Sequence, residues 1–297
     1  MPDWPDQHVV EVGDGVLALL QGDGEAGVSN AGLVLEDGVA LVVDTTMFPE
    51  MAQGLVDELA HRSATAEVVL NTHHHVDHIG GNTLFAGARI VAHPRTVDTV
   101  IASGHPTAIY DGFMTAFRGR FDDLEVVAPE PADDALHLPL GARLRSYVPA
   151  HTPGDTAVWL ADERILFTGD LCFFGVTPLA LQGLLSSWIA ALDDLIALEP
   201  AVVVPGHGPV GGIPDIELVR DHLAALLAHG RAAVEAGASL DDALASFDAG
   251  PVAEWIEAER AVVNLERAMQ EARGEIDEHE LSVIPPSFGR LLHLDGC

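Results

Sequence analysis

The stretch VVLNTHHHVDHIGGN, residues 68–82, decides how the rest of the chain is interpreted. Its first three residues are apolar and predict a buried strand. The positions that follow include His73, His75, Asp77 and His78. Each of these polar side chains needs a partner that an apolar interior does not offer, whereas a metal ion does offer one. The stretch therefore predicts a metal site at the end of a strand.

The composition is that of a globular protein with a large acidic excess. The 297 residues include 46 acidic side chains against 14 basic ones, all of them arginine, and the formal net charge is −32. This balance argues against a nucleic-acid partner and against attraction to a membrane surface. No apolar run is long enough for a spanning helix. The start of the chain, MPDWPDQHVV, lacks the pattern of an export signal, so we expect a cytoplasmic enzyme.

The order of β-rich and helical segments predicts an α/β core. Four short β-rich runs within residues 8–44 alternate with turn residues and indicate an antiparallel meander. Residues 48–61 have helical spacing and precede the strand that leads into the histidines. A second β-rich half then follows, with predicted strands at 124–128, 135–138, 142–151, 156–161 and 164–170.

The chain becomes helical after Pro214. Apolar residues recur there at three- and four-residue intervals in the segments 216–237, 239–247 and 252–275. We therefore expect a core over residues 1–212 and a helical extension, residues 213–297, that packs on it. The sequence leaves open whether this extension covers the site or pairs two subunits in a homodimer.

Further polar residues stand at strand ends in the second half. His151, Asp170 and His207 each follow a β-rich run, in the segments PAHTPGDT, LFTGDL and VPGHGP. With the first cluster they make five imidazoles and two carboxylates, which are too many for one tetrahedral ion. They suit two ions that share a bridging carboxylate and a bridging water, with open positions for a substrate.

Residues beside this set have less specific roles. Strand alternation points His73 and His75 the same way and His74 elsewhere, so His74 is left out of the set. Gly80 and Gly81 are expected to let the backbone turn sharply. Surface positions or ordinary packing are expected for the other histidines, which are His8, His61, His93, His105, His137, His222, His229, His279 and His293.

Four aromatic residues and Cys172 each have a structural and a functional interpretation. The aromatic residues form either part of the core or the lining of a substrate mouth; they are Tyr110, Phe113, Phe117 and Phe121. The two cysteines, Cys172 and Cys297, are too few for a disulfide framework. Cys172 follows Asp170 closely, and a small buried residue is expected there in preference to a catalytic thiol.

Together the motifs resemble the metallo-β-lactamase superfamily, whose hallmark is HxHxDH followed by a distant His, an Asp and a final His. The resemblance covers roughly residues 10–212 and implies a four-layer αββα sandwich with the metal site at the edge between two sheets. It assigns His73, His75 and His151 to one metal, Asp77, His78 and His207 to the other, and Asp170 to the bridge. Asp44, from its position alone a loop acid, the cap of the next helix or a site residue, matches an early aspartate of the family that orients a metal ligand.

The chemistry that the resemblance implies is hydrolysis or aldol condensation at two divalent metal ions. Zinc is favoured, with iron and manganese as alternatives, because sites of His and carboxylate accept all three. Such ions can polarise a carbonyl and stabilise the oxyanion or enolate that forms. Asp77 and Asp170 are the expected catalytic carboxylates. The ligands do not choose the substrate.

A narrower resemblance concerns the substrate. Four segments look like the metallo-β-lactamase-type cyclases of bacterial aromatic polyketide pathways, namely 28–38, 68–75, 168–183 and 188–212. This implies closure of the second ring of a polyketide bound to an acyl carrier protein, by intramolecular aldol condensation, with thioesterase release of the chain as a further activity. The apolar run 171–179 suits a flat aromatic substrate or is simply core. An acidic carrier protein would need a local arginine patch near the site entrance, formed by Arg118 and Arg120 or by Arg143 and Arg145.

Other functions remain open. A glyoxalase-II-like thioesterase or a lactonase would use the same metals on a small ester or thioester. Glyoxalase II enzymes usually have a histidine after HTPG, where this chain has Asp155, and their basic ligand-binding residues are hard to place in a chain without lysine. A metal-binding regulatory or scaffold protein would be free to lose ligands, whereas this set is complete.

Overall fold

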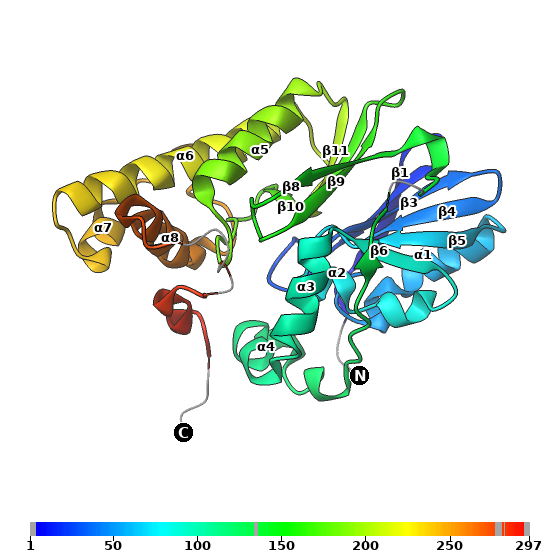
Figure 1. The fold of residues 1–297 in the computed structure, drawn as a ribbon, viewed down its shortest axis with the longest axis horizontal. Helices are drawn as coiled ribbons and strands as arrows, with labels where there is room; N and C mark the ends of the chain where they lie inside the picture. The colour runs from blue at the N-terminus through cyan, green and yellow to red at the C-terminus, as the bar shows by residue number, and fades with distance from the viewer. Residues whose placement is uncertain (1–3, 134–135, 277–280, 282, 294–297) are drawn as a thin grey trace.

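The structure, a computed structural model, describes residues 4–133, 136–276, 281 and 283–293. Two β-sheets pack face to face, and helices cover the outer face of each sheet (Figure 1). Apolar residues from both sheets fill the space between them, among them Val34, Leu41, Val158 and Phe167. The four-layer αββα sandwich expected from the sequence is therefore confirmed.

The first sheet has seven strands, which lie side by side in sequence order. The strands β1 to β4 are antiparallel, whereas β4 to β7 run parallel. The turn between β3 and β4 has positive φ at Asp37 (49°) and Gly38 (82°), as two-residue hairpins require, which explains the Asp-Gly pair. The strands are β1 (Gln7–Gly13), β2 (Val16–Gln21), β3 (Ala31–Glu36), β4 (Val39–Val43), β5 (Thr65–Leu70), β6 (Arg89–Ala92) and β7 (Glu130–Pro131).

The second sheet has four strands in the order β11-β10-β9-β8. The pairs β8–β9 and β9–β10 are antiparallel, whereas β10 and β11 are parallel. A parallel pair needs a crossover, and helix α5 provides it, so the carboxyl ends of β10 and β11 lie at one edge. The strands are β8 (Arg143–Tyr147), β9 (Asp155–Leu160), β10 (Ile165–Phe173) and β11 (Val202–His207).

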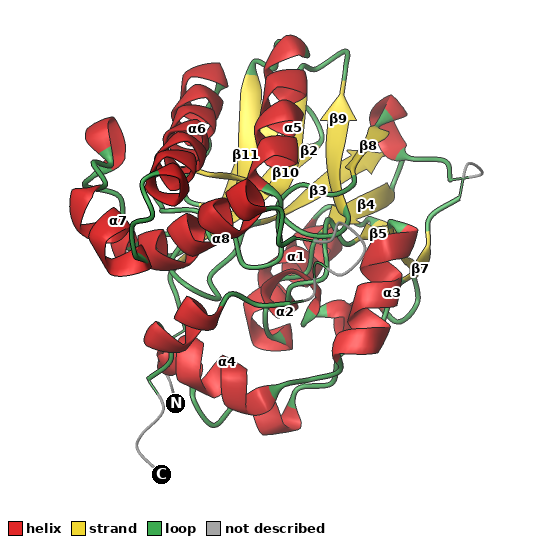
Figure 2. Cartoon of the chain, turned by 60° about the vertical axis from the view of Figure 1, so that its left-hand side comes forward, coloured by secondary structure: helices red, strands yellow, loops and turns green. Residues whose placement is uncertain are grey.

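Helices form the two outer layers. On the first sheet, α1 buries Leu55 and Leu59. On the second sheet, α5 and α6 lie side by side and bury Trp188, Leu192 and Leu223 (Figure 2). The helices are α1 (Pro49–His61), α2 (Val76–Ile79), α3 (Pro94–Ser103), α4 (Thr107–Phe113), α5 (Leu185–Ala197), α6 (Ile213–Glu235), α7 (Leu240–Ser246) and α8 (Ala261–Arg273).

Two of the strands predicted in the second half are wrong. Residues 124–128 form no strand, and neither do the described residues 136–138 of the strand predicted at 135–138. The first sheet is instead extended by β7, which pairs with β6 through two residues. Pro129 and Pro131 lack the N–H groups that a longer ladder would need.

The helix predicted over 252–275 is wrong in its first part, since α8 begins only at Ala261. Ile256 pairs instead with the loop after β10, where Thr177 N donates to Ile256 O at 3.0 Å. Glu257 then has a φ of 59°, a left-handed conformation through which a right-handed helix does not continue. Tertiary pairing therefore overrides the helical periodicity of this segment.

The C-terminal helices pack closely on one another. α6 begins at Ile213, and at Gly230 it approaches α8 so closely that a Cβ there would lie 2.7 Å from the Cβ of Ala268. The division of the chain at residue 212 stays a prediction. Among the described residues, no helix is both long and apolar enough to cross a membrane. His279 and Cys297 lie outside the described residues.

His222 on α6 is a position at which the helical region is sensitive to acid. Its ring is buried beside Phe247 and Trp255, and neither ring nitrogen has a hydrogen-bond partner among the described residues. Burial lowers the pKa of His222 to about 4, whereas a histidine in an unfolded chain has a pKa of about 6.5. Below pH 6.5 the unfolded chain binds the additional proton, so stability is lost as the pH falls toward 4.

We predict that the free energy of unfolding of the wild type falls by about 2 kcal/mol more than that of His222→Leu between pH 7.5 and pH 5. Urea denaturation of both proteins at the two pH values measures this difference. Leu227→Ala, on the same helix, removes no titratable group and should lower stability equally at both. Identical pH dependence in His222→Leu and the wild type would contradict the prediction.

Candidate metal centre

The residues of the predicted metal site meet at one edge of the sandwich. His73 and His78 follow β5, Asp170 lies in β10, His207 ends β11, and His151 lies in the loop between β8 and β9. Strand ends are where loops can carry polar groups without disturbing the core. All seven residues of the set fall into two groups, and within each group the ligand atoms lie within 4.8 Å of one another.

The first group consists of His73, His75, His151 and Asp170. His75 Nδ1 lies 3.0 Å from His73 Nε2 and 3.2 Å from His151 Nε2. Asp170 Oδ2 lies 3.6 Å from His73 Nε2 and 3.4 Å from His151 Nε2. Strand alternation is the wrong reason for this convergence, because β5 ends at Leu70 and the histidines follow in the loop before α2.

The second group consists of Asp77, His78 and His207. Asp77 and His78 lie on the short helix α2, and Asp77 Oδ2 lies 3.3 Å from His207 Nε2. Asp170 Oδ1 lies 3.1 Å from His78 Nε2 and 3.5 Å from His207 Nε2. Each carboxylate oxygen of Asp170 therefore faces one group, which is the arrangement of a bridging ligand.

The donor atoms fit two divalent cations. His78 Nε2 and Asp170 Oδ1 are buried and, although they lie 3.1 Å apart, neither has a hydrogen bond of suitable geometry to a described residue. Burial disfavours a charge on Asp170, yet the imidazoles beside it, His78 foremost, hold the pKa of this carboxyl well below its usual value. Burial also disfavours a charge on His78, but Asp170 and Asp44 raise its pKa well above the usual value. The surroundings therefore favour positive charge here, and nitrogen and oxygen donors suit zinc, iron or manganese.

Asp44 connects the end of β4 to the loop that carries the histidines. Its φ of 59° is unusual for a residue with a side chain and turns the carboxylate toward the neighbouring strand end. Oδ1 accepts a hydrogen bond from Thr72 N at 2.7 Å, and Oδ2 lies 2.7 Å from Thr72 Oγ1 and 2.8 Å from His78 Nδ1. With its Nδ1 hydrogen bonded to Asp44, His78 turns Nε2 toward the centre, which is the orienting contact that the resemblance implies.

Two glycines allow backbone segments to approach the centre closely. A Cβ on Gly80 would lie 1.8 Å from Met47 O, and a Cβ on Gly206 would lie 1.9 Å from Asp170 Oδ1. The φ of Gly80 is an ordinary −65°. The expectation that Gly80 and Gly81 are needed for a sharp turn is therefore wrong. Glycine is needed there because a side chain would overlap with the backbone of Met47 and Thr45.

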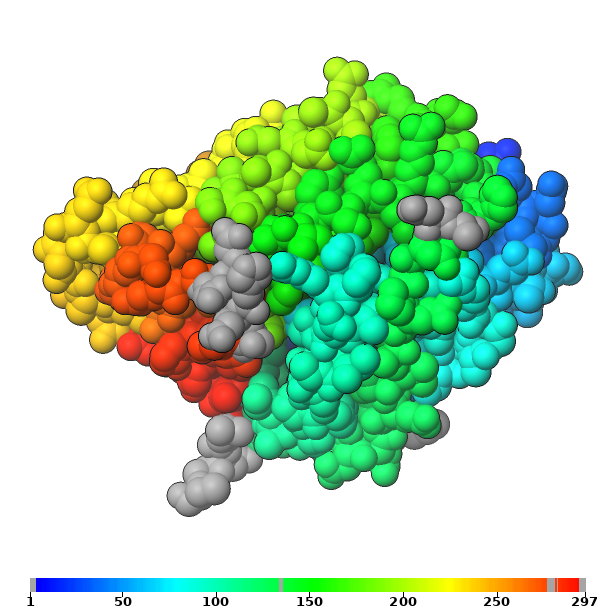
Figure 3. Space-filling model, in the orientation of Figure 1, coloured from blue at the N-terminus to red at the C-terminus, as the bar shows by residue number. Residues whose placement is uncertain are grey.

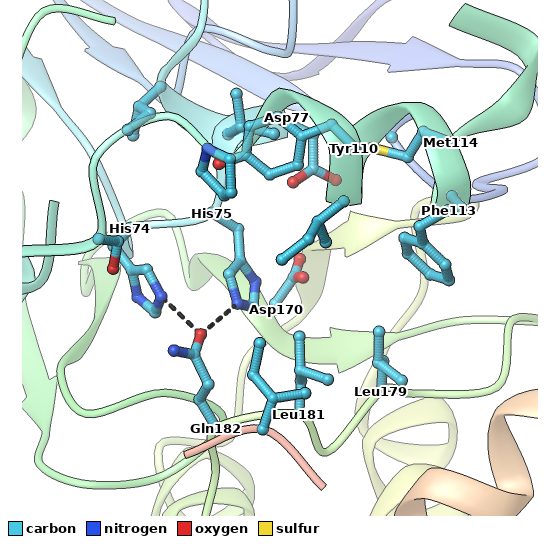
Figure 4. Close-up of a pocket in the computed structure, with 18 of the residues that line it drawn as sticks. His74, His75, Asp77, Tyr110, Phe113, Met114, Asp170, Leu179, Leu181 and Gln182 are labelled. Atoms are coloured by element: carbon cyan, nitrogen blue, oxygen red, sulfur yellow. Dashed lines mark hydrogen bonds between the residues drawn. The ribbon is translucent and has the colours of Figure 1, made fainter. Parts of the chain in front are cut away.

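His74 and Gln182 belong to the site although the sequence does not indicate them. Gln182 Oε1 lies 2.7 Å from His74 Nε2 and 3.3 Å from His75 Nε2 (Figure 4). An amide oxygen only accepts hydrogen bonds, so both imidazoles carry hydrogen on Nε2, and His75 keeps a lone pair on the Nδ1 that faces the centre. Burial lowers the pKa of His74 to about 3, which keeps it neutral. No motif links residues 108 positions apart, and only the fold joins them.

A cavity of about 170 Å³ opens onto the centre and is lined there by His75, Asp77, His151, Asp170 and His207. Its other walls are mostly apolar (Figure 4). Of the four aromatic residues with two interpretations, Tyr110 and Phe113 line the cavity, whereas Phe117 and Phe121 belong to a core cluster. Phe173, from the apolar run after Asp170, also lines it.

Other residues considered from the sequence lie away from this cavity. Cys172 packs in a buried hydrophobic cluster, and burial raises the pKa of its thiol to about 12. Arg145 pairs with Asp194 at 2.7 Å, and Arg120 stacks 3.9 Å from the ring of Trp4. The cavity is lined by none of the four arginines proposed for a carrier-protein patch, all of which the structure describes: Arg118, Arg120, Arg143 and Arg145.

The fold and the paired groups define the class of protein, an αββα sandwich with His and Asp ligand groups gathered between its two sheets. A family model described as "Metallo-beta-lactamase superfamily" matches residues 24–207, which is more than half of the chain. The chain therefore belongs to the metallo-β-lactamase superfamily, whose members typically bind divalent metal ions.

Curated relatives share part of their length with this chain. The hydroxyacylglutathione hydrolase of Synechococcus sp. (strain JA-3-3Ab) is 30% identical over 171 residues, which cover 57% of this chain and 58% of that protein. The 2,4-dinitroanisole O-demethylase subunit alpha of Nocardioides sp. (strain JS1661) is 28% identical over 205 residues, which cover 67% of this chain and 55% of that protein. The chain thus spans less than two thirds of the length of these relatives.

Solved structures are similar in fold. The structure of TMB-1 aligns with a TM-score of 0.59 and 19% identity over 74% of this chain and 98% of that chain. The sec-alkylsulfatase Pisa1 from Pseudomonas sp. aligns with a TM-score of 0.68 and 16% identity over 94% of this chain and 52% of that chain. These likenesses concern the fold alone. None of these four proteins is named as a polyketide cyclase, so that narrower resemblance stays a prediction.

We predict that Gln182→Ala weakens metal binding, because His75 loses the partner that sets its tautomer. The expected loss is about 10- to 100-fold in affinity. Competition with a chromophoric chelator measures it on the metal-loaded protein. Gln53→Ala, which changes an exposed residue of α1, is the control and should bind metal like the wild type. Equal affinities of Gln182→Ala and the wild type would rule out this role for Gln182.

Proposed function

We propose that this protein is a metal-dependent hydrolase that cleaves a small thioester or ester, the glyoxalase-II-like alternative considered from the sequence. The observation that carries the proposal is the position of Asp170 between two donor groups at one end of a cavity. The relatives named hydroxyacylglutathione hydrolase support a thioester as the bond that is cleaved.

Two bound divalent ions would supply Lewis acidity toward the carbonyl group and would lower the pKa of a water molecule. The residues that would hold them are His73, His75 and His151 on one side and Asp77, His78 and His207 on the other, with Asp170 between. Hydrolysis joins the water oxygen to the acyl carbon, breaks the carbon–sulfur bond and passes a proton to the leaving thiolate. Burial opposes ionisation of Asp77, but His78 and His207 lower its pKa to about 2, so this carboxylate can accept a hydrogen bond from water in the cavity.

Asp155, which stands where glyoxalase II enzymes usually have a histidine, is compatible with this proposal. Its carboxylate accepts hydrogen bonds from Thr152 N at 2.8 Å and from Thr152 Oγ1 at 2.9 Å, and so closes the turn after His151. Burial raises the pKa of Asp155 to about 8. Since Asp155 contacts the turn and does not line the cavity, its difference from histidine leaves the donor set unchanged.

A second candidate is the polyketide cyclase, and the aromatic cavity wall favours it. Tyr110, Phe113 and Phe173 offer ring faces on which a flat aromatic substrate could stack. The acyl carrier protein remains a proposed partner of this candidate, and a homodimer a proposed assembly. The two functions differ in their products, because ring closure alone releases no thiol whereas hydrolysis does.

We predict that the purified protein holds about two divalent ions per chain and releases thiol from acyl thioesters. Asp170→Ala should lose metal and should lower kcat/KM by more than roughly 100-fold. Loss of a residue that only hydrogen-bonds a metal ligand costs up to roughly 100-fold, and loss of a ligand itself should cost more. Elemental analysis measures the metal, and a thiol-reactive dye measures hydrolysis of lactoylglutathione and of aromatic acyl thioesters.

His137→Ala serves as the control for this experiment, because His137 is exposed and lies outside the donor set. It should keep both the metal and the activity. Full metal content and full activity in Asp170→Ala would refute the proposed function. Conversion of an aromatic polyketide thioester to a ring product without thiol release would favour the cyclase instead.

A further inference from the structure

We infer that Arg260 and the apolar walls beside it form a subsite for the carboxylate group of an elongated, apolar ester or thioester substrate. The inference rests on the proposed function, because it names the substrate class of the same site. Arg260 is the one arginine among the described residues that line the cavity, in a chain of net charge −32. A single guanidinium matches the single charge and the two oxygens of a carboxylate, whereas a phosphate dianion would call for more cations.

The guanidinium of Arg260 has a buried nitrogen, Nε, without a hydrogen-bond partner in the part of the chain that the structure describes. The residue is only 2% exposed, and Nη1 donates to Thr177 O at 2.9 Å. Nε lies 3.6 Å from Glu257 Oε2, which is too far for a hydrogen bond. Glu257 Oε2 forms an ion pair with this nitrogen, while Glu257 Oε1 accepts a hydrogen bond from Ala26 N at 2.9 Å. A buried donor without an acceptor is destabilising, so this position suits a ligand that brings one.

Arg267 shows what a structural arginine looks like on the same helix. It is also 2% exposed, but its Nε donates to Gly183 O at 2.8 Å and its Nη1 to Val283 O at 3.2 Å. These bonds tie α8 to two other segments of the chain. Arg267 does not line the cavity. The two arginines are therefore a matched pair, equal in burial, and each has one buried nitrogen without a hydrogen-bond partner among the described residues, Nε in Arg260 and Nη2 in Arg267. They differ in that Arg260 lines the cavity.

The wall beside Arg260 is aromatic and comes from two distant parts of the chain. Phe113 of α4 and Phe288 of the short helix Pro286–Arg290 have ring centroids 5.2 Å apart. The guanidinium carbon of Arg260 lies 5.9 Å from the ring centroid of Phe113. His293 N also donates to Gly112 O at 2.8 Å, which holds the C-terminal segment against α4 (Figure 3). An apolar substrate body in the cavity would therefore lie on these aromatic rings, with the arginine and the metal ligands in the same cavity lining.

The test uses the full-length, metal-loaded protein and two N-acetylcysteamine thioesters of the same arylalkanoic acid. One carries a carboxylate on the far side of the ring, and the other carries a carboxamide there. We expect the wild type to have a kcat/KM about 10- to 100-fold higher for the carboxylate thioester than for the carboxamide thioester. Arg260→Gln should lose this preference because its kcat/KM falls for the carboxylate thioester and stays the same for the carboxamide thioester. Arg267→Gln is the matched control and should keep the preference.

A second measurement is independent of turnover. Isothermal titration with the free aryl dicarboxylate should show the same loss of affinity in Arg260→Gln relative to the wild type. An unchanged preference in Arg260→Gln, or no preference in the wild type, would overturn the inference. If neither thioester is cleaved, the proposed function fails and the titration alone decides the role of Arg260. If Arg260→Gln does not fold, Arg260→Lys decides, because lysine cannot form the paired hydrogen bonds and should lower the preference.

Discussion

The structure depends on the burial of carboxylates at one point between the two sheets. Asp44, Asp77 and Asp170 are buried there together, and acidic groups at this separation are costly unless positive charge lies among them. Burial opposes a charge on His78, but the same three carboxylates raise the pKa of its imidazole well above the usual value. A divalent cation bound at these donor atoms would displace the imidazole proton into solvent, so metal affinity would depend on pH.

The backbone around the centre is adapted to this constraint. Asp44 takes a left-handed φ so that one carboxylate reaches both Thr72 and His78, which joins β4 to the loop after β5. Gly206 leaves room for Asp170, because a Cβ there would overlap with the carboxylate. Both features place a strained or crowded backbone where the donor atoms must converge, and such strain persists only where surrounding structure holds it.

The parts of the fold that depend on local sequence could be predicted. The meander followed from alternating β-rich runs with Asp-Gly turns, and the donor set followed from short motifs at strand ends. Contacts between distant segments could not be predicted. The pairing of Ile256 with Thr177 replaced a predicted helix, and the contact of Gln182 with His75 left no trace in any spacing. The prediction that strand alternation orients the histidines is wrong for a similar reason, because His73 and His75 lie in the loop after β5 and not in the strand.

The division of labour along the chain explains why membership of the family leaves the substrate undecided. The residues that could hold metal lie within 24–207, the part that the family model matches. The cavity is also lined by residues that lie beyond residue 207, namely Arg260, Ile284 and Phe288. These residues reach the cavity because α8 packs on α6 and the C-terminal segment packs on α4. A substitution beyond residue 207 can therefore change which substrate the cavity accepts while the geometry of the metal-ligand residues stays the same. Substrate specificity thus depends on the whole chain, whereas the donor set lies within the part that the family model matches.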